Sequence, residues 1–278
     1  MSYAFAGEGS LNYFPCKYGS SKLTFRGPAR STLGDYLVTL GGTETFGKFV
    51  EAPFPHLLER RLSLPVINLG CMNAGPDLYL NEPDILAIAT SARACVVQIL
   101  GAQNMSNRYY SVHRRRNDRF LVATHLLRGM FPTVDFTEFN FTRHMLTALQ
   151  TAAPDRFEVV AEELRAGWVL QMRNLLSRLR LPTVLLWASD AVPPEPQQRS
   201  KILCDAPLVD AEMINAIRPM ATRYIEVISS TAARAEGVSA MKFSPLERHS
   251  AAALPGQAVH AEIAAQVASA LRAYIPLG

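Results

Sequence analysis

The sequence contains few cysteines and no residue pattern that is typical of a metal site. Its 278 residues include only Cys16, Cys71, Cys95 and Cys204, and no two of these form a CxxC pair. Without that spacing, the sequence predicts neither a zinc site nor a redox site. HxH and HExxH motifs are also absent, and we therefore expect no metal.

The glycine-rich motifs of nucleotide-binding proteins are missing as well. Neither GxGxxG nor GxxxxGK[ST] follows a predicted strand, so the sequence favours neither a dinucleotide site nor a P-loop. We expect no cofactor.

Long apolar runs, a secretory signal and a strong excess of charge are absent too. No stretch approaches the roughly 20 apolar residues that cross a bilayer. The amino terminus has no basic segment followed by an apolar one, so it does not resemble a secretory signal. We expect a cytoplasmic protein without a membrane span. There are 28 Lys and Arg residues against 24 Asp and Glu residues, an excess too small to predict nucleic acid binding.

The composition that remains is typical of a folded protein. Hydrophobic residues make up 49% of the chain and charged residues 19%, which excludes a disordered chain. Apolar runs of strand length alternate with helical patterns along most of the sequence. The predicted strands are 36–40, 65–70, 95–100, 182–188 and 224–228, and the main predicted helices are 54–64, 82–93, 161–180 and 258–274.

This alternation predicts a flavodoxin-like three-layer α/β/α sandwich, in which helices cover both faces of a mostly parallel five-stranded sheet. We expect one domain over residues 1–278, with an irregular lead-in at 1–35 and a helical insertion at 105–165 that shows no clear strand. In open parallel sheets the ligand lies beyond the carboxyl ends of the strands. The loops 41–47, 70–76 and 101–108 follow three of the strands, so we expect them to form one site.

The segment at 40–47, LGGTETFG, follows directly after the first predicted strand. Several hydrolases expose a nucleophile on such a turn between strand and helix, with backbone N–H groups directed at a developing oxyanion. The segment resembles the LGDSxTxG block of the SGNH (GDSL-type) hydrolase family. The resemblance places Gly42 at the family's aspartate and Thr43 at its nucleophilic serine.

Two later segments resemble the family's oxyanion blocks. In VINLGCMNAG, residues 66–75, Asn73 falls on the glycine whose N–H group binds the oxyanion, and Gly75 could serve with a small shift. In LGAQN, residues 100–104, either Gln103 or Asn104 could take the role of the family's oxyanion-binding asparagine.

A fourth segment resembles the family's final block. His249 falls a few residues before a glycine-initiated last helix, where the family places its histidine base. The family's acid would fall on Leu246, which leaves Glu247 as the acidic neighbour that could orient the imidazole. The chain as a whole also resembles a family of uncharacterised alphaproteobacterial proteins, a resemblance that implies no function.

For the central residues the sequence leaves two interpretations open. Thr43 is the nucleophile if a base such as His249 removes its proton, or else it only caps the helix that follows. Glu44 is either an acid or base of the site, or a first-turn carboxylate that the helix dipole favours.

A cluster of arginines follows the loop after the third strand. Because guanidinium groups suit phosphate, sulfate and carboxylate groups, we expect Arg108, Arg114, Arg115 and Arg116 to hold an anionic part of a substrate. The alternative is an exposed helix face or an interface patch. Tyrosines are interleaved with the arginines, but no nucleic-acid motif is present and we do not expect nucleic acid as a partner.

The sequence thus supports three hypotheses. The leading one is a divergent SGNH-like hydrolase or acyl-group transferase that acts on a small-molecule or acylated substrate with an anionic group. The second is a non-catalytic binding or assembly protein on the same fold, because the block residues are substituted. The third is transfer of a sulfuryl or phosphoryl group, because of the arginines. A homo-oligomer or larger assembly stays open.

Overall fold

A computed structural model describes residues 11–198 and 206–275. Its main sheet has five strands, all parallel, in the order β2-β1-β3-β6-β7. Counted along the chain, the strands of this sheet follow the order 2-1-3-4-5, which is that of flavodoxin-like folds. The predicted fold class is therefore confirmed. The strands are β1 (Leu37–Leu40), β2 (Val66–Asn68), β3 (Ala94–Gln98), β6 (Thr183–Ser189) and β7 (Arg223–Ile228).

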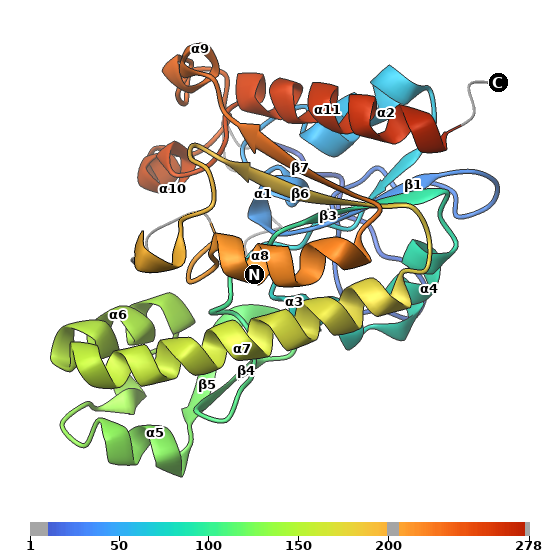
Figure 1. The fold of residues 1–278 in the computed structure, drawn as a ribbon. Helices are drawn as coiled ribbons and strands as arrows, with labels where there is room; N and C mark the ends of the chain where they lie inside the picture. Colours follow the sequence, from blue (N-terminus) through green and yellow to red (C-terminus); the bar gives the residue numbers. More distant parts are fainter. Residues whose placement is uncertain (1–10, 199–205, 276–278) are drawn as a thin grey trace.

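Helices cover both faces of the sheet (Figure 1). Successive strand residues point to opposite faces, and both faces are buried. Leu37 and Val96 belong to the apolar cluster under one helical layer, whereas Val38 and Val97 belong to the cluster under the other. The first layer contains α2 (Phe54–Leu62) and α11 (Gln257–Leu271), and the second contains α3 (Pro76–Leu80), α4 (Pro83–Thr90), α7 (Pro154–Arg178) and α8 (Ala211–Ile217).

Short helices occupy several of the connections. Four of them, α3, α8, α9 and α10, were not predicted from the sequence, because five to seven residues are too few to show a helical period. Outside the insertion between β3 and β6, the other elements are α1 (Thr43–Phe46), α9 (Thr231–Ala235), α10 (Arg248–Ala252) and the 3-10 turns η2 (Pro196–Gln198), η3 (Arg218–Met220), η4 (Pro245–Glu247) and η5 (Arg272–Tyr274).

The insertion between β3 and β6 contains helices and also a hairpin that the sequence analysis did not predict. Strands β4 (Tyr110–His113) and β5 (Arg116–Ala123) pair antiparallel, with register shifts on either side of Val112. The extra residues lie in β5 and break its alternation of apolar and polar residues, by which a strand is recognised. Strand β4 does alternate but has only four residues. The helical part consists of α5 (His125–Met130), η1 (Phe136–Glu138), α6 (Thr142–Ala152) and the first half of α7.

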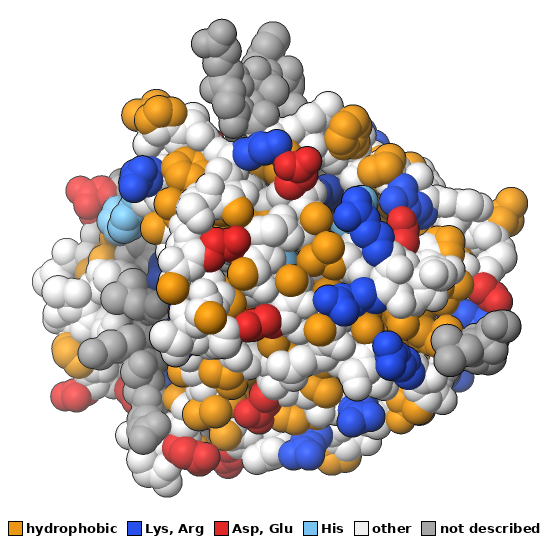
Figure 2. All heavy atoms as spheres, turned by 90° about the horizontal axis from the view of Figure 1, so that it is seen from above, with side chains coloured by type: hydrophobic (Ala, Val, Ile, Leu, Met, Phe, Trp, Pro, Cys, Tyr) orange, Lys and Arg blue, Asp and Glu red, His pale blue; other side chains and the backbone are white. Residues whose placement is uncertain are grey.

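The lengths of the helices, the charges on the surface and the burial of the cysteines can each be compared with what the composition suggested. No helix within the described residues is both long enough and apolar enough to span a membrane. The face seen in Figure 2 carries charged side chains of both signs among apolar ones. Cys71 and Cys95 are buried, which raises the pKa of their thiols, and with Cys16 they are free of disulfides. Cys204 lies outside the described residues.

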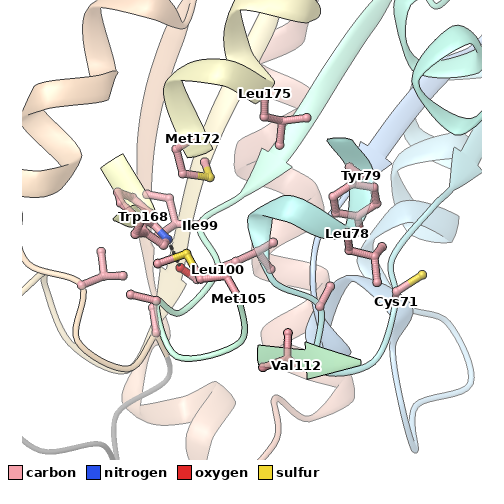
Figure 3. Packing of buried hydrophobic residues seen from close by; sticks show 14 of the residues in the cluster. Cys71, Leu78, Tyr79, Ile99, Leu100, Met105, Val112, Trp168, Met172 and Leu175 are labelled. Atoms are coloured by element: carbon pink, nitrogen blue, oxygen red, sulfur yellow. Dashed lines mark hydrogen bonds between the residues drawn. The ribbon is translucent and has the colours of Figure 1, made fainter. Parts of the chain in front are cut away.

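The packing of α7 fixes the loop that follows β3. The indole N–H of Trp168 donates to the carbonyl oxygen of Leu100 at 2.8 Å, and Trp168 and Met172 pack beside Ile99, Leu100 and Met105 (Figure 3). The loop that carries two of the predicted site residues is therefore held by the core.

His260 of α11 joins the two helices of the first layer. Its Nδ1 accepts the backbone N–H of Phe54 at 3.1 Å, and only 1% of the residue is exposed. Burial, with a smaller contribution from Arg26, lowers the pKa of the imidazole to about 3. The ring is therefore neutral at all physiological pH values.

We predict that His260 makes the protein acid-sensitive. In the unfolded chain histidine titrates near pH 6.5, so between about pH 6.5 and 3 only the unfolded state takes up this proton. The free energy of unfolding should fall with each pH unit below about 6.5, by on the order of 1 kcal/mol from His260 alone. His260→Asn keeps an acceptor for Phe54 but does not titrate. Urea unfolding at several pH values should give a shallower acid slope for this variant, and equal slopes would contradict the assignment.

Candidate active site

The three loops that the sequence singles out do meet in one pocket, with a volume of about 520 Å³. It lies beyond the carboxyl ends of β1, β2 and β3, and the α10 segment closes it from the other side. Its lining includes seven of the predicted site residues: Gly42, Thr43, Glu44, Asn73, Gln103, Asn104 and His249.

Tyr79 of α3 fixes the turn after β1. Its buried hydroxyl accepts the N–H of Gly41 at 2.9 Å, and the same oxygen lies 2.6 Å from the carbonyl oxygen of Gly41 and 2.9 Å from that of Leu69, the two acceptors for its proton. Burial raises the pKa of Tyr79 well above its ordinary value, so the hydroxyl keeps its proton. A Cβ atom at Gly41 would lie 2.0 Å from Thr45 Oγ1, and only glycine fits there.

Gln98, which the sequence analysis missed, holds the next part of the turn. Its side-chain oxygen accepts the N–H of Gly42 at 3.1 Å and the hydroxyl of Thr45 at 2.5 Å. Its amide nitrogen donates to Glu44 Oε2 at 2.8 Å. Gln98 is buried at the end of β3, so the Glu44 carboxylate is fixed at the pocket wall. Gln98 is the one polar residue within the apolar run CVVQIL, and this could have indicated its role in the sequence.

Thr43 begins α1 and contacts Asn73 twice. Its hydroxyl donates to Asn73 Oδ1 at 3.3 Å, and its oxygen accepts the backbone N–H of Asn73 at 3.0 Å. Asn73 has φ = 56°, the left-handed conformation that glycine adopts without cost and asparagine tolerates. The structure thus gives Asn73 the backbone that a glycine would have at this position.

The side chains around Asn73 are arranged as a hydrogen-bonded chain. Its side-chain nitrogen donates to Asp118 Oδ2 at 3.1 Å. Its backbone carbonyl oxygen accepts from the side-chain nitrogen of Asn104 at 2.9 Å. Asn104 in turn accepts the hydroxyl proton of Thr142, at 2.7 Å. Asp118 and Thr142 both belong to the insertion, so the insertion completes this wall of the site.

Two other predicted residues have different surroundings. The N–H of Gly75 donates to Asn117 Oδ1 at 2.9 Å, and Gly75 does not line the pocket. Gln103 does line the pocket, but its buried side-chain oxygen has no hydrogen-bond partner among the described residues.

His249 and Glu247 do not form a pair. The Glu247 carboxylate caps η4 by accepting from Ser244 at 3.0 Å and lies 3.4 Å from the Lys48 ammonium group. His249 is exposed on α10 and lines the pocket, and no described residue hydrogen-bonds to its imidazole. The residue at the family's acid position, Leu246, is 98% exposed.

The predicted arginines lie outside the pocket. Arg108 pairs with Glu163 at 3.0 Å, Arg114 donates to the carbonyl oxygen of Asn81 at 2.8 Å, and Arg115 pairs with Glu82 at 2.9 Å. Arg116 is exposed at the start of β5. The arginines follow the loop at 101–108 closely in the sequence, but this closeness could not show that the hairpin directs their side chains away from the pocket.

Two cations that were not predicted line the pocket instead, Lys48 and Arg143. Arg143 lies in the first turn of α6 and is exposed. No described residue forms an ion pair with its guanidinium group or accepts a hydrogen bond from it. Arg143 lies about 100 residues after the turn at 41–47, and no pattern in the sequence indicated that it would line the same pocket.

Comparisons with known proteins give a family and remote structural likenesses. A family model described as "Domain of unknown function (DUF6473)" matches residues 1–275, and no curated protein matches. A lipase from a goat rumen metagenome is 12% identical, with 85% of this chain and 97% of that chain covered and a TM-score of 0.44. An acetyl xylan esterase from Butyrivibrio proteoclasticus is 12% identical, with 91% and 68% covered and a TM-score of 0.42. The resemblance to alphaproteobacterial proteins finds no support here.

We predict that Tyr79→Phe destabilises the protein by about 1–3 kcal/mol, the range expected when buried polar groups lose their partner. The variant leaves the backbone groups of Gly41 without the phenol hydroxyl. Tyr36→Phe is the matched control, because its partly buried hydroxyl bonds the carbonyl oxygen of Ile88 and the side chain of Ser91 and does not contact the turn after β1. Urea unfolding of both variants measures the difference. If Tyr79→Phe lowers the free energy of unfolding no more than Tyr36→Phe does, the role given to Tyr79 is contradicted.

Proposed function

The chain belongs to the DUF6473 family, and we propose that its pocket hydrolyses or transfers an acyl group of a substrate that also carries an anionic group. Thr43 is the attacking group and His249 the base. One observation carries the proposal. The backbone N–H of Asn73, in a left-handed conformation, lies 3.0 Å from Thr43 Oγ1 in a pocket that His249 also lines.

The contact between Thr43 and Asn73 supports an oxyanion-binding role for Asn73. In an acyl transfer, an N–H donor must lie within about 2.7–3.1 Å of the developing oxyanion. The Asn73 N–H is bonded to the Thr43 hydroxyl in the resting site. When the Thr43 oxygen turns toward an acyl carbon, that N–H is released beside it and becomes available to the carbonyl oxygen under attack.

The proton of Thr43 must move in the same step. In the proposal the Thr43 oxygen forms a bond to the acyl carbon while its proton passes to the imidazole of His249, which then gives it to the leaving group. Water, or a second acceptor, takes the acyl group from Thr43. Glu44, fixed by Gln98, is the alternative base on the same wall.

The anionic part of the substrate is assigned to Lys48 and Arg143. Both line the pocket, and a guanidinium group is well suited to carboxylate, phosphate and sulfate groups. The hairpin arginines lie outside the pocket and are not needed for this role.

A second candidate is a binding protein without catalysis. One observation favours it: two of the expected oxyanion donors are already used within the protein, the N–H of Gly75 by Asn117 and the amide of Asn104 by the carbonyl oxygen of Asn73. The two candidates differ in whether any acyl substrate is turned over.

We predict that Thr43→Ala and His249→Ala each lower kcat/KM for 4-nitrophenyl acetate at least hundredfold, as loss of a nucleophile or general base does. Thr43→Ser should raise kcat, because the β-methyl group no longer crowds the attack. His125→Ala, an exposed histidine in α5, and Thr90→Ala are the matched controls. Turnover that survives both site variants would exclude this mechanism, and no turnover by the natural protein would favour the binding protein.

We further predict that Arg143→Gln raises KM about tenfold for an ester with a carboxylate or phosphate in its alcohol part, since one charge-assisted contact is lost. The KM for a neutral ester should stay unchanged. Arg116→Gln, in the hairpin and outside the pocket, is the control. If Arg116→Gln rather than Arg143→Gln raises KM, the hairpin arginines bind the anionic group.

A further inference from the structure

A second cavity of about 370 Å³ lies beside the first. It is enclosed by the end of β6, by α9, by the end of α10 and by the first turns of α11, at the edge of the sheet toward which β6 and β7 point in Figure 1. Neither the sequence blocks nor the proposed function uses it. Much of its lining is apolar: Ala188, Ala233, Val238, Ala252, Ala253, Leu254, Pro255, Val259 and Ile263.

The two cavities are neighbours. Glu44, Ala253 and Leu254 line both of them, so the two cavities adjoin at these three residues. Glu44 follows Thr43 directly in the chain. A molecule whose reacting carbon lies at Thr43 could therefore extend past Glu44 into the second cavity.

The charges around the second cavity argue against an anionic occupant. Besides Glu44, the acidic residue in its lining is Asp190, whose carboxylate accepts the hydroxyl proton of Ser229. The one arginine in the lining, Arg234, donates to the backbone carbonyl oxygen of Asp190 at 3.0 Å. A largely apolar lining that also contains two carboxylates suits an uncharged apolar group better than an anion. The cations Lys48 and Arg143 line the first cavity.

We propose that the second cavity binds the apolar part of the acyl group, an alkyl chain of several carbons or an aromatic ring. This assignment rests on the proposed function, which sets how the substrate is oriented. The acyl chain lies in the second cavity, the carbonyl group lies at Thr43, and the anionic part lies at Lys48 and Arg143. The volume falls within the range of small-molecule sites. Burial of methylene groups against these walls supplies the binding energy.

Direct binding of uncharged amides tests the proposal without requiring catalysis. Calorimetric titration of the full chain should show hexanamide binding at least tenfold more tightly than acetamide. Equal affinities, or no binding of hexanamide, would overturn the proposal. Thr43→Ala should bind hexanamide as the natural protein does, so the cavity is tested even if Thr43 turns out not to be catalytic.

Two variants locate the binding site. Ala252→Trp places a large side chain at the exposed last residue of α10 and should abolish the preference for hexanamide. Ala152→Trp, at the exposed last residue of α6, is the matched control and should leave the preference unchanged. Val259→Thr, nearly the same size, should weaken hexanamide binding severalfold at a temperature where the variant is still folded, as its melting curve shows. Unchanged binding in both Ala252→Trp and Val259→Thr would show that the amide binds elsewhere and would overturn the assignment.

Discussion

Three backbone groups at the ends of β1 and β2 share one phenol hydroxyl, that of Tyr79. This arrangement requires the two strand ends to approach closely. Glycine at position 41 leaves room for Thr45, and glycine at position 70 leaves room for the backbone of α1, which a Cβ atom would meet at 2.4 Å. The contact between Thr43 and Asn73 depends on this approach, because each residue follows one of the two strand ends.

The sheet could be predicted because its strands are short apolar runs with buried side chains on both faces. Parallel strands of this kind are easily recognised in a sequence. The hairpin β4–β5 could not be predicted, because β4 has only four residues and the extra residues of β5 disturb its alternation. Helix α7 was predicted from residue 161, whereas it begins at Pro154, where proline fits the first turn.

The lining of the pocket could be predicted where residues follow strand ends and not where distant segments supply side chains. Thr43, Asn73 and Asn104 were expected at one edge of the sheet because parallel strands bring their carboxyl ends there, and all three line the pocket. Asp118 and Arg143 come from the insertion, whose path across this edge no local pattern reveals. The arginine cluster shows the converse: closeness in sequence to a site loop did not bring those side chains to the pocket, because the hairpin directs them to partners such as Glu82.

The segment that carries His249 is attached to the rest of the protein by a small apolar cluster of its own. Phe49, Val50, Met241 and Ala251 form this cluster apart from the two that flank the sheet. A unit with so few buried contacts opens at a lower free energy than the sheet does. We therefore expect the part of the pocket wall that His249 forms to open while the sheet stays folded. Access to Thr43 and the position of His249 then depend on one local equilibrium, which is separate from the global stability of the fold.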